Sequence, residues 1–217
     1  MTTETRPFVD GFGRPVTYLR LSVTDRCDLR CTYCMPQHMI FTPRKSLLGV
    51  AELDRIAEAF VAGGVRKIRL TGGEPLVRKD LPELLRGLAR HLAAGRLDEI
   101  TVSTNGSQLA RLAETLADCG VRRVNVSLDT LDPDQYREIT RGGELSDVLE
   151  GIEAARHAGL SIRINSVALR GVIEEQFEPL LRYAHGNDMA LALIETMPLG
   201  ETGPSRHKSP TRLLFTL

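Results

Sequence analysis

The sequence predicts an α/β fold in which six parallel strands and their covering helices form a partial, TIM-like (β/α)6 barrel. Short apolar segments alternate along the chain with amphipathic segments, whose apolar residues recur three or four positions apart, as in Leu53, Ile56, Ala57 and Phe60. Strand–helix alternation of this kind is typical of right-handed βαβ units and a parallel sheet. A closed barrel needs eight units, so six predict an open one.

The first two strands are expected over Tyr18–Thr24 and Val65–Thr71, because both segments are rich in apolar residues. In each strand one arginine, Arg20 or Arg69, stands between two apolar neighbours. Alternate residues of a strand point to opposite faces, so the apolar neighbours face the helices and the arginines face away. Between the strands, the amphipathic segment Val50–Ala62 predicts a helix, and a glycine pair follows it where a C-cap belongs.

The later units follow the same plan. The remaining strands are expected over Glu99–Ser103, Arg122–Leu128, Leu160–Leu169 and Leu191–Glu195, and the remaining helices over Leu81–Ala94, Gln108–Asp118, Leu145–Ala158 and Glu174–His185. In open α/β folds, ligands bind at the carboxyl ends of the strands. Functional residues are therefore expected in the segments that follow each strand.

Three cysteines directly after the first strand give the strongest functional signal. Cys27, Cys31 and Cys34 have the spacing C-x3-C-x2-C, and Tyr33 precedes the last of them. Thiolates are soft ligands that suit iron–sulfur clusters. Three of them can hold three irons of a four-iron cluster and leave the fourth iron without a protein ligand. An open coordination position usually indicates chemistry rather than a structural role.

The cysteines could also have other roles. A Cys3His zinc site could recruit His38, whereas a disulfide is less expected. Cys119 stands at a helix end before a strand, where a small buried hydrophobic residue is the simplest interpretation. The polar first ten residues predict no secretory signal, so free thiols in a reducing cytoplasm are expected.

Composition excludes two classes of partner. The hydrophobic content of 42% allows one sizeable core, but no apolar stretch approaches the roughly 20 residues that span a bilayer. Twenty-eight basic and 28 acidic side chains balance, and tryptophan is absent. Neither a membrane nor a nucleic acid is therefore expected as a partner, and an anionic ligand must be held by local cations.

Three arginines are expected to supply such cations. Arg20, Arg69 and Arg163 each lie between apolar neighbours on a predicted strand, so all three face away from the covering helices. Arginine is almost never fully buried unless it is paired. Facing one cavity, the three guanidinium groups would suit a polyphosphate or a carboxylate-rich substrate. The alternative is internal pairing with Glu74, Asp129 or Glu195.

The segments after the other strands are also polar. In Gly72-Gly73-Glu74-Pro75, two glycines would let the backbone approach a ligand, although such a turn can be a simple βα connection. Thr104, Asn105 and Asp129 end later strands, where helix capping and function are equally plausible roles. Ser127 shares a strand face with Asn125, which predicts a lined cavity rather than a dry core.

Taken in order, these motifs resemble the GTP 3′,8-cyclase family of molybdenum cofactor biosynthesis, within the radical S-adenosylmethionine (radical SAM) enzymes. The matching segments are Gly13–Pro15, Leu19–Cys27, Cys31–Pro36, Ile68–Leu76, Ser103–Gly106, Val124–Asp129 and Ile194–Met197. The resemblance implies a radical SAM core domain over residues 13–200 and a tail over residues 201–217.

The resemblance also implies roles for individual residues, with no side chain assigned to acid–base catalysis. Cys27, Cys31 and Cys34 would hold one [4Fe–4S] cluster; Tyr33, Gly72, Gly73, Glu74, Ser127 and Met197 would bind S-adenosylmethionine; Arg20, Arg69, Ser103 and Arg163 would bind GTP. In the family, a 5′-deoxyadenosyl radical takes hydrogen from C3′ of GTP, and the carbon radical attacks C8. A lyase in the cytoplasm, a reducing electron donor protein and a homodimer are expected accordingly.

Two departures from the family pattern qualify this expectation. Ala192 stands where the family often carries an arginine, and the chain ends before the family's C-terminal segment with its second cluster. We therefore expect a C-terminally truncated core that cleaves S-adenosylmethionine, with impaired turnover of GTP. The alternatives are another radical SAM enzyme, such as a peptide-modifying maturase, and a remnant that binds a cluster without catalysis.

Overall fold

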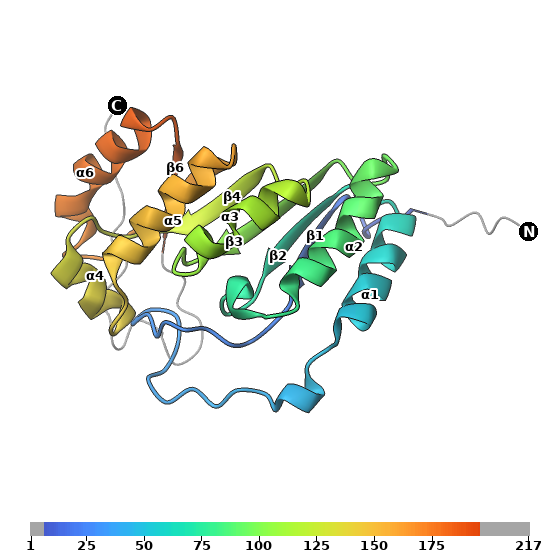
Figure 1. Cartoon of the computed structure of the whole chain (residues 1–217), viewed down its shortest axis with the longest axis horizontal. Helices are drawn as coiled ribbons and strands as arrows, with labels where there is room; N and C mark the ends of the chain where they lie inside the picture. The colour runs from blue at the N-terminus through green and yellow to red at the C-terminus, as the bar shows by residue number, and fades with distance from the viewer. Residues whose placement is uncertain (1–6, 196–217) are drawn as a thin grey trace, which may run out of the picture.

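The computed structural model describes residues 7–195, and these residues form an α/β fold around one six-stranded sheet (Figure 1). The strands are β1 (Tyr18–Ser22), β2 (Lys67–Thr71), β3 (Glu99–Thr104), β4 (Arg123–Ser127), β5 (Ser161–Val167) and β6 (Ala190–Ile194). They lie in sequence order, and every neighbouring pair is parallel. The predicted α/β class and parallel sheet are confirmed.

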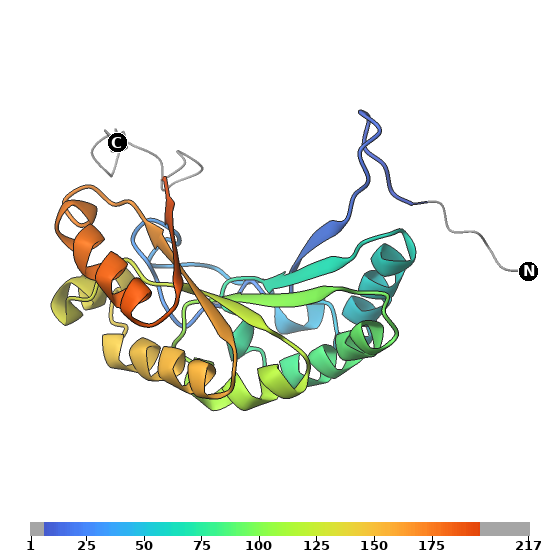
Figure 2. The same cartoon turned by 90° about the horizontal axis from the view of Figure 1, so that it is seen from above.

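Helices connect consecutive strands and cover one side of the sheet. They are α1 (Val50–Ala62), α2 (Leu81–Ala93), α3 (Leu109–Asp118), α4 (Pro133–Thr140), α5 (Leu145–His157) and α6 (Ile173–Gly186), with short 3-10 turns η1 (Arg44–Ser46) and η2 (Pro75–Val77). Figure 2 shows that the sheet is curved, that the helices pack against its convex side, and that its concave face is open. The described residues therefore form a partial barrel.

Strand alternation explains why one face is buried and the other open. In β2, Ile68 and Leu70 are buried beneath the helices, whereas Arg69 between them lies on the opposite face and is only half-buried. The helices contribute leucines to the same core, such as Leu53 of α1 and Leu84 of α2. Burying a side chain of this size stabilises the fold by about 1.5–3 kcal/mol. The hydrophobic pattern thus decides which face remains open for a site.

The expected boundaries agree with the structure to within about two residues. The exception is α4, which the sequence analysis did not predict. Its signals are nevertheless present, because Pro133 opens the helix and the Asp132 side chain accepts a hydrogen bond from the backbone N–H of Gln135. The helix has only eight residues, so its hydrophobic periodicity is weak.

None of the helices within residues 7–195 is both long and apolar enough to cross a membrane.

Candidate active site

The segment that carries the three cysteines crosses the carboxyl edge of the sheet, and residues 27–35 are called the cysteine loop below. Two backbone hydrogen bonds attach this loop to the end of α4: the N–H of Arg30 donates to the carbonyl of Thr140 (3.1 Å), and that of Thr32 donates to Ile139 (2.9 Å). Figure 1 shows the loop passing beside α4. Helix α4, which was not predicted from the sequence, thus supports the cysteine loop.

Arg141 strengthens this attachment. It follows α4 in a left-handed conformation, with φ of 56°, which is uncommon for a residue other than glycine. Its guanidinium donates to the carbonyl oxygens of Arg30 and Met35, each at 3.0 Å. These two oxygens lie on either side of Cys31 and Cys34, so one side chain spans the part of the loop with two of the cysteines.

A second attachment joins the loop to β4. The hydroxyl of Tyr33 donates to Oδ2 of Asp129 (2.7 Å), and the other oxygen of Asp129 accepts from the backbone N–H of Val167 (2.7 Å). Burial raises the pKa of Asp129 to about 6 and also raises that of Tyr33. Asp129 therefore has a bridging role between the loop and two strands, beyond the capping role that its position suggested.

The Gly-Gly segment after β2 packs backbone against backbone on the residues that lead into Cys27. A Cβ at Gly72 or Gly73 would lie 2.4 Å from the carbonyl oxygen of Thr24 or Arg26, respectively, so no larger residue fits without a shift. The N–H of Gly73 donates to Thr24 (2.8 Å), and that of Glu74 donates to Arg26 (2.7 Å). The glycines thus bring two strand ends together.

Glu74 is fully buried and joins the ends of β2 and β3. Its carboxylate accepts hydrogen bonds from the backbone N–H of Leu76 (2.9 Å), the hydroxyl of Thr104 (2.8 Å) and the backbone N–H of Asn105 (2.5 Å). Burial raises the pKa of this carboxyl to about 7, because the three hydrogen bonds only partly compensate for the lost hydration.

The three thiols of the loop are free and lie close enough to influence one another. The pKa of Cys27 is raised to about 11 and that of Cys31 to about 12, mainly by burial, with nearby carboxylates and the neighbouring Cys34 adding to the effect. Metal binding displaces the proton of such a thiol, because the ligand is the thiolate. This donor set, three soft sulfurs on one loop, fits an iron–sulfur cluster.

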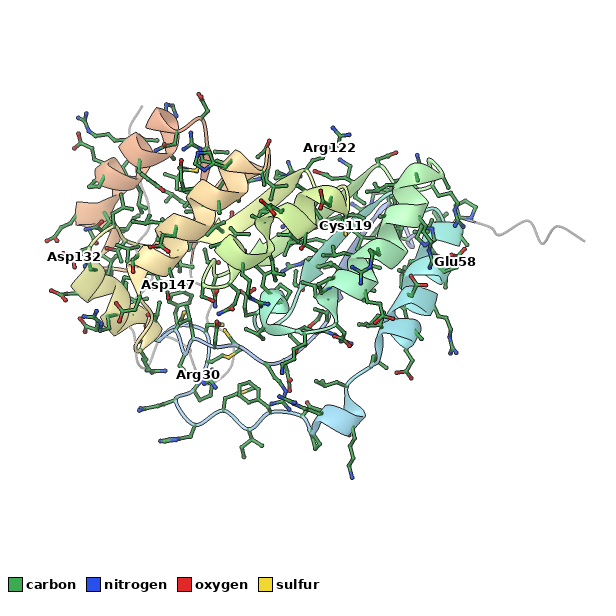
Figure 3. The ribbon with its side chains drawn as sticks, viewed as in Figure 1. Arg30, Glu58, Cys119, Arg122, Asp132 and Asp147 are labelled. Carbon is green, nitrogen blue, oxygen red and sulfur yellow. The ribbon has the colours of Figure 1, made fainter. Side chains whose placement is uncertain are left out.

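The zinc alternative has no support within residues 7–195. No group of three or more His, Cys, Asp or Glu side chains there is arranged around a single metal-ion position, and His38 is exposed. A four-iron cluster needs a different arrangement from a zinc ion. Each cysteine binds a different iron of the cluster, so the sulfurs need not converge on one position. Cys119 lies in the hydrophobic core at the end of α3, well separated from Arg30 of the cysteine loop in Figure 3.

The three predicted arginines share the open face of the sheet. Arg20 lies opposite Arg69 in the register of β1 and β2, and Arg163 lies opposite Asn125 in that of β4 and β5. Arg69 contacts the hydroxyl of Thr101 (Nε–Oγ1 3.4 Å) and the ring of Tyr18. Within the described residues none of the three arginines forms an ion pair, so the alternative of internal pairing is not observed.

The remaining predicted site residues lie on the same open face of the sheet, except for one that falls outside residues 7–195. Ser103 is half-buried beside Asn125, and Ser127 is exposed at the end of β4. Ala192 lies opposite Asn165 in β6, so a small side chain borders the polar row there. Met197 lies outside the described residues.

Comparisons with known proteins agree with this geometry. The radical SAM superfamily model matches residues 21–184. A GTP 3′,8-cyclase of Rhodopseudomonas palustris strain CGA009 is 62% identical over 205 residues, which cover 94% of this chain and 60% of the relative. One of Rhizobium meliloti strain 1021 is 61% identical over 206 residues, covering 95% and 59%. The chain thus spans about 60% of the length of these curated relatives.

Solved structures share the fold at low sequence identity. Streptococcus suis SuiB bound to S-adenosylmethionine superimposes with a TM-score of 0.73 at 20% identity, covering 92% of this chain and 43% of SuiB. Methylornithine synthase (PylB) gives 0.65 at 19% identity, covering 92% and 56%. Both agree with the open partial barrel described above.

Proposed function

The chain belongs to the radical SAM superfamily, and we propose that Cys27, Cys31 and Cys34 hold one four-iron cluster. The supporting observation is that three free thiols stand on one loop, which α4 and Asp129 fix over the carboxyl edge of the sheet. With three irons ligated by protein, the fourth remains open to the cofactor. When bound, the cluster and S-adenosylmethionine supply a reductive cleavage that yields a 5′-deoxyadenosyl radical. A reducing partner protein would donate the electron.

We propose that the Gly-Gly segment receives the amino group of S-adenosylmethionine. An ammonium ion only donates hydrogen bonds, so the backbone groups that would receive it are the carbonyl oxygens of Gly72 and Gly73. The N–H of Gly73 donates to Thr24 and holds this backbone in place. The oxygens of Glu74 accept hydrogen bonds from the protein itself. Its proposed role for the cofactor is therefore to hold the backbone of this segment in place. Tyr33, Ser127 and Met197 complete the cofactor site by resemblance to the family.

For the substrate we propose GTP, bound on the open face by Arg20, Arg69 and Arg163 with Ser103 beside them. Guanidinium groups bind phosphate oxygens in pairs, and three of them without a carboxylate partner in the described part of the chain suit a triphosphate. The relatives named above are GTP 3′,8-cyclases, so the proposed product is GTP cyclised between C3′ and C8.

The cofactor reaction can be tested without GTP. Anaerobic reconstitution is expected to give about four irons per chain, as in a [4Fe–4S] centre. Dithionite and S-adenosylmethionine should then yield 5′-deoxyadenosine, measured by chromatography. Fully loaded protein that forms none would contradict the enzymatic assignment, and a zinc content in place of iron would contradict the cluster.

The substrate assignment predicts that Arg69→Ala weakens GTP binding. Losing one charged hydrogen-bonding group costs about 1.5–3 kcal/mol, which corresponds to roughly 10–150-fold in Kd by calorimetry on the loaded protein. The matched control is Arg122→Ala, which removes an exposed arginine just before β4 and should leave Kd unchanged. Equal affinity for all three proteins, or binding of a peptide where GTP fails, would reject GTP as the ligand of this face.

A further inference from the structure

The side chain of Asn105 contacts the cysteine loop from the end of β3, a contact separate from the one that its backbone makes with Glu74. Its amide nitrogen Nδ2 lies 2.8 Å from Oδ1 of Asp28 and 3.8 Å from the sulfur of Cys27. Its backbone N–H donates to Glu74. Asn105 thus joins the buried carboxylate to the first cysteine.

The orientation of this amide is fixed by a third contact. The backbone N–H of Ser107 donates to Oδ1 of Asn105 (3.0 Å), so the oxygen points to the start of α3 and the nitrogen points to the loop. The nitrogen carries two hydrogens. One can reach Asp28 and the other the sulfur of Cys27.

Asp28 itself is held firmly in place. Besides Asn105, the hydroxyl of Ser107 (2.6 Å) and the amide of Gln108 (3.3 Å) donate to its Oδ2. Its Oδ1 lies 3.9 Å from the sulfur of Cys27. The sulfur therefore has a carboxylate oxygen and an amide donor close to it, and these two groups are hydrogen-bonded to each other.

We propose that Asn105 is a positioning residue that raises the reduction potential of the cluster held by Cys27. The inference rests on the proposed function. A hydrogen bond to a ligating sulfur withdraws electron density and favours the reduced cluster, whereas a nearby carboxylate disfavours it. The amide of Asn105 donates to the sulfur and also to Asp28, where it partly offsets the negative charge. Both contacts therefore raise the reduction potential. A cluster that must accept an electron before the cofactor reacts depends on this balance.

The test is the variant Asn105→Ser, which keeps a side-chain oxygen for the turn to Ser107 but removes the amide donor. The midpoint potential of the loaded protein is measured by a redox titration followed by electron paramagnetic resonance, without S-adenosylmethionine. We expect the equilibrium constant for one-electron reduction to fall about tenfold, which corresponds to about 59 mV.

The matched control is Gln108→Ala. Gln108 carries the same amide group and also donates to Asp28, but it makes no contact with a cysteine in the described structure, so its loss should lower the potential clearly less than Asn105→Ser does. An Asn105→Ser protein with full iron and an unchanged potential would overturn the inference. An equal shift in Gln108→Ala would also overturn it, because the effect would then come from Asp28 alone.

Two further results separate this inference from the proposed function. A wild-type chain that assembles no cluster would reject the proposed function itself. If Asn105→Ser fails to hold iron, Asn105→Thr supplies the same test with a larger side chain. Loss of iron from both variants while Gln108→Ala remains loaded would overturn the inference in favour of a purely structural role.

Discussion

Replacing Cys31 with serine is expected to abolish stable iron binding and to lower 5′-deoxyadenosine formation by more than about 100-fold. Loss of a residue that merely orients a metal ligand already costs 10–100-fold, and this change removes a ligand itself. Cys31 is the middle cysteine of the loop and lies between the two carbonyl oxygens that Arg141 holds. The measurements are iron per chain after anaerobic reconstitution and product formed with dithionite.

The control for this change is Cys119→Ala. Cys119 is buried in the hydrophobic core at the end of α3, so its replacement should alter neither iron content nor product. Wild-type iron and activity in Cys31→Ser would reject the three-cysteine ligation. A loss of iron in Cys119→Ala equal to that in Cys31→Ser would show that the fourth cysteine takes part.

Glu74→Ala is expected to lower the free energy of unfolding of the metal-free protein by about 3 kcal/mol. The change leaves three donors, from Leu76, Thr104 and Asn105, without their common acceptor in a buried region. Urea unfolding measures the loss. Glu150→Ala on the exposed side of α5 is the matched control and should lie within about 0.5 kcal/mol of the wild type. A small effect at both positions would contradict the role given to Glu74.

The same carboxyl gives the stability a pH dependence of defined sign. Because burial raises its pKa from 4.5 to about 7, the folded state holds the Glu74 proton more tightly than the unfolded state does. The stabilising contribution is therefore complete below pH 4.5 and is lost as the pH rises through about 7. Compared with Glu74→Gln, the wild type should lose up to about 3 kcal/mol over this range. A difference that stays constant with pH would show an ordinary pKa.

Much of this arrangement followed from local patterns in the sequence. The alternation around Arg20, Arg69 and Arg163 placed all three on the open face, because side-chain direction in a strand depends only on residue parity. The strand and helix order likewise predicted a parallel sheet. Those patterns extend over a few residues, and the geometry of a strand or helix depends on neighbouring residues alone.

The supports of the cysteine loop could not be predicted in this way. Tyr33 and Asp129 are 96 residues apart, and Asn105 and Asp28 are 77 apart, so each pair meets only because the sheet register brings it together. The sequence of the two glycines predicts a close approach to a ligand, whereas their tightest contacts are with Thr24 and Arg26 of their own chain. For α4, the signal at Asp132 and Pro133 was present in the sequence, but its importance depended on contacts made far along the chain.

The long separation between the cysteines and their anchors has a consequence for biosynthesis. A nascent polypeptide that has emerged only through β3 already displays Cys27, Cys31 and Cys34, yet it lacks Asp129 and the end of α4 that hold them in place. Metal delivered before that moment would meet three cysteines whose loop is not yet attached to Asp129 or to the end of α4. We therefore expect stable metal loading only after translation has passed Arg141.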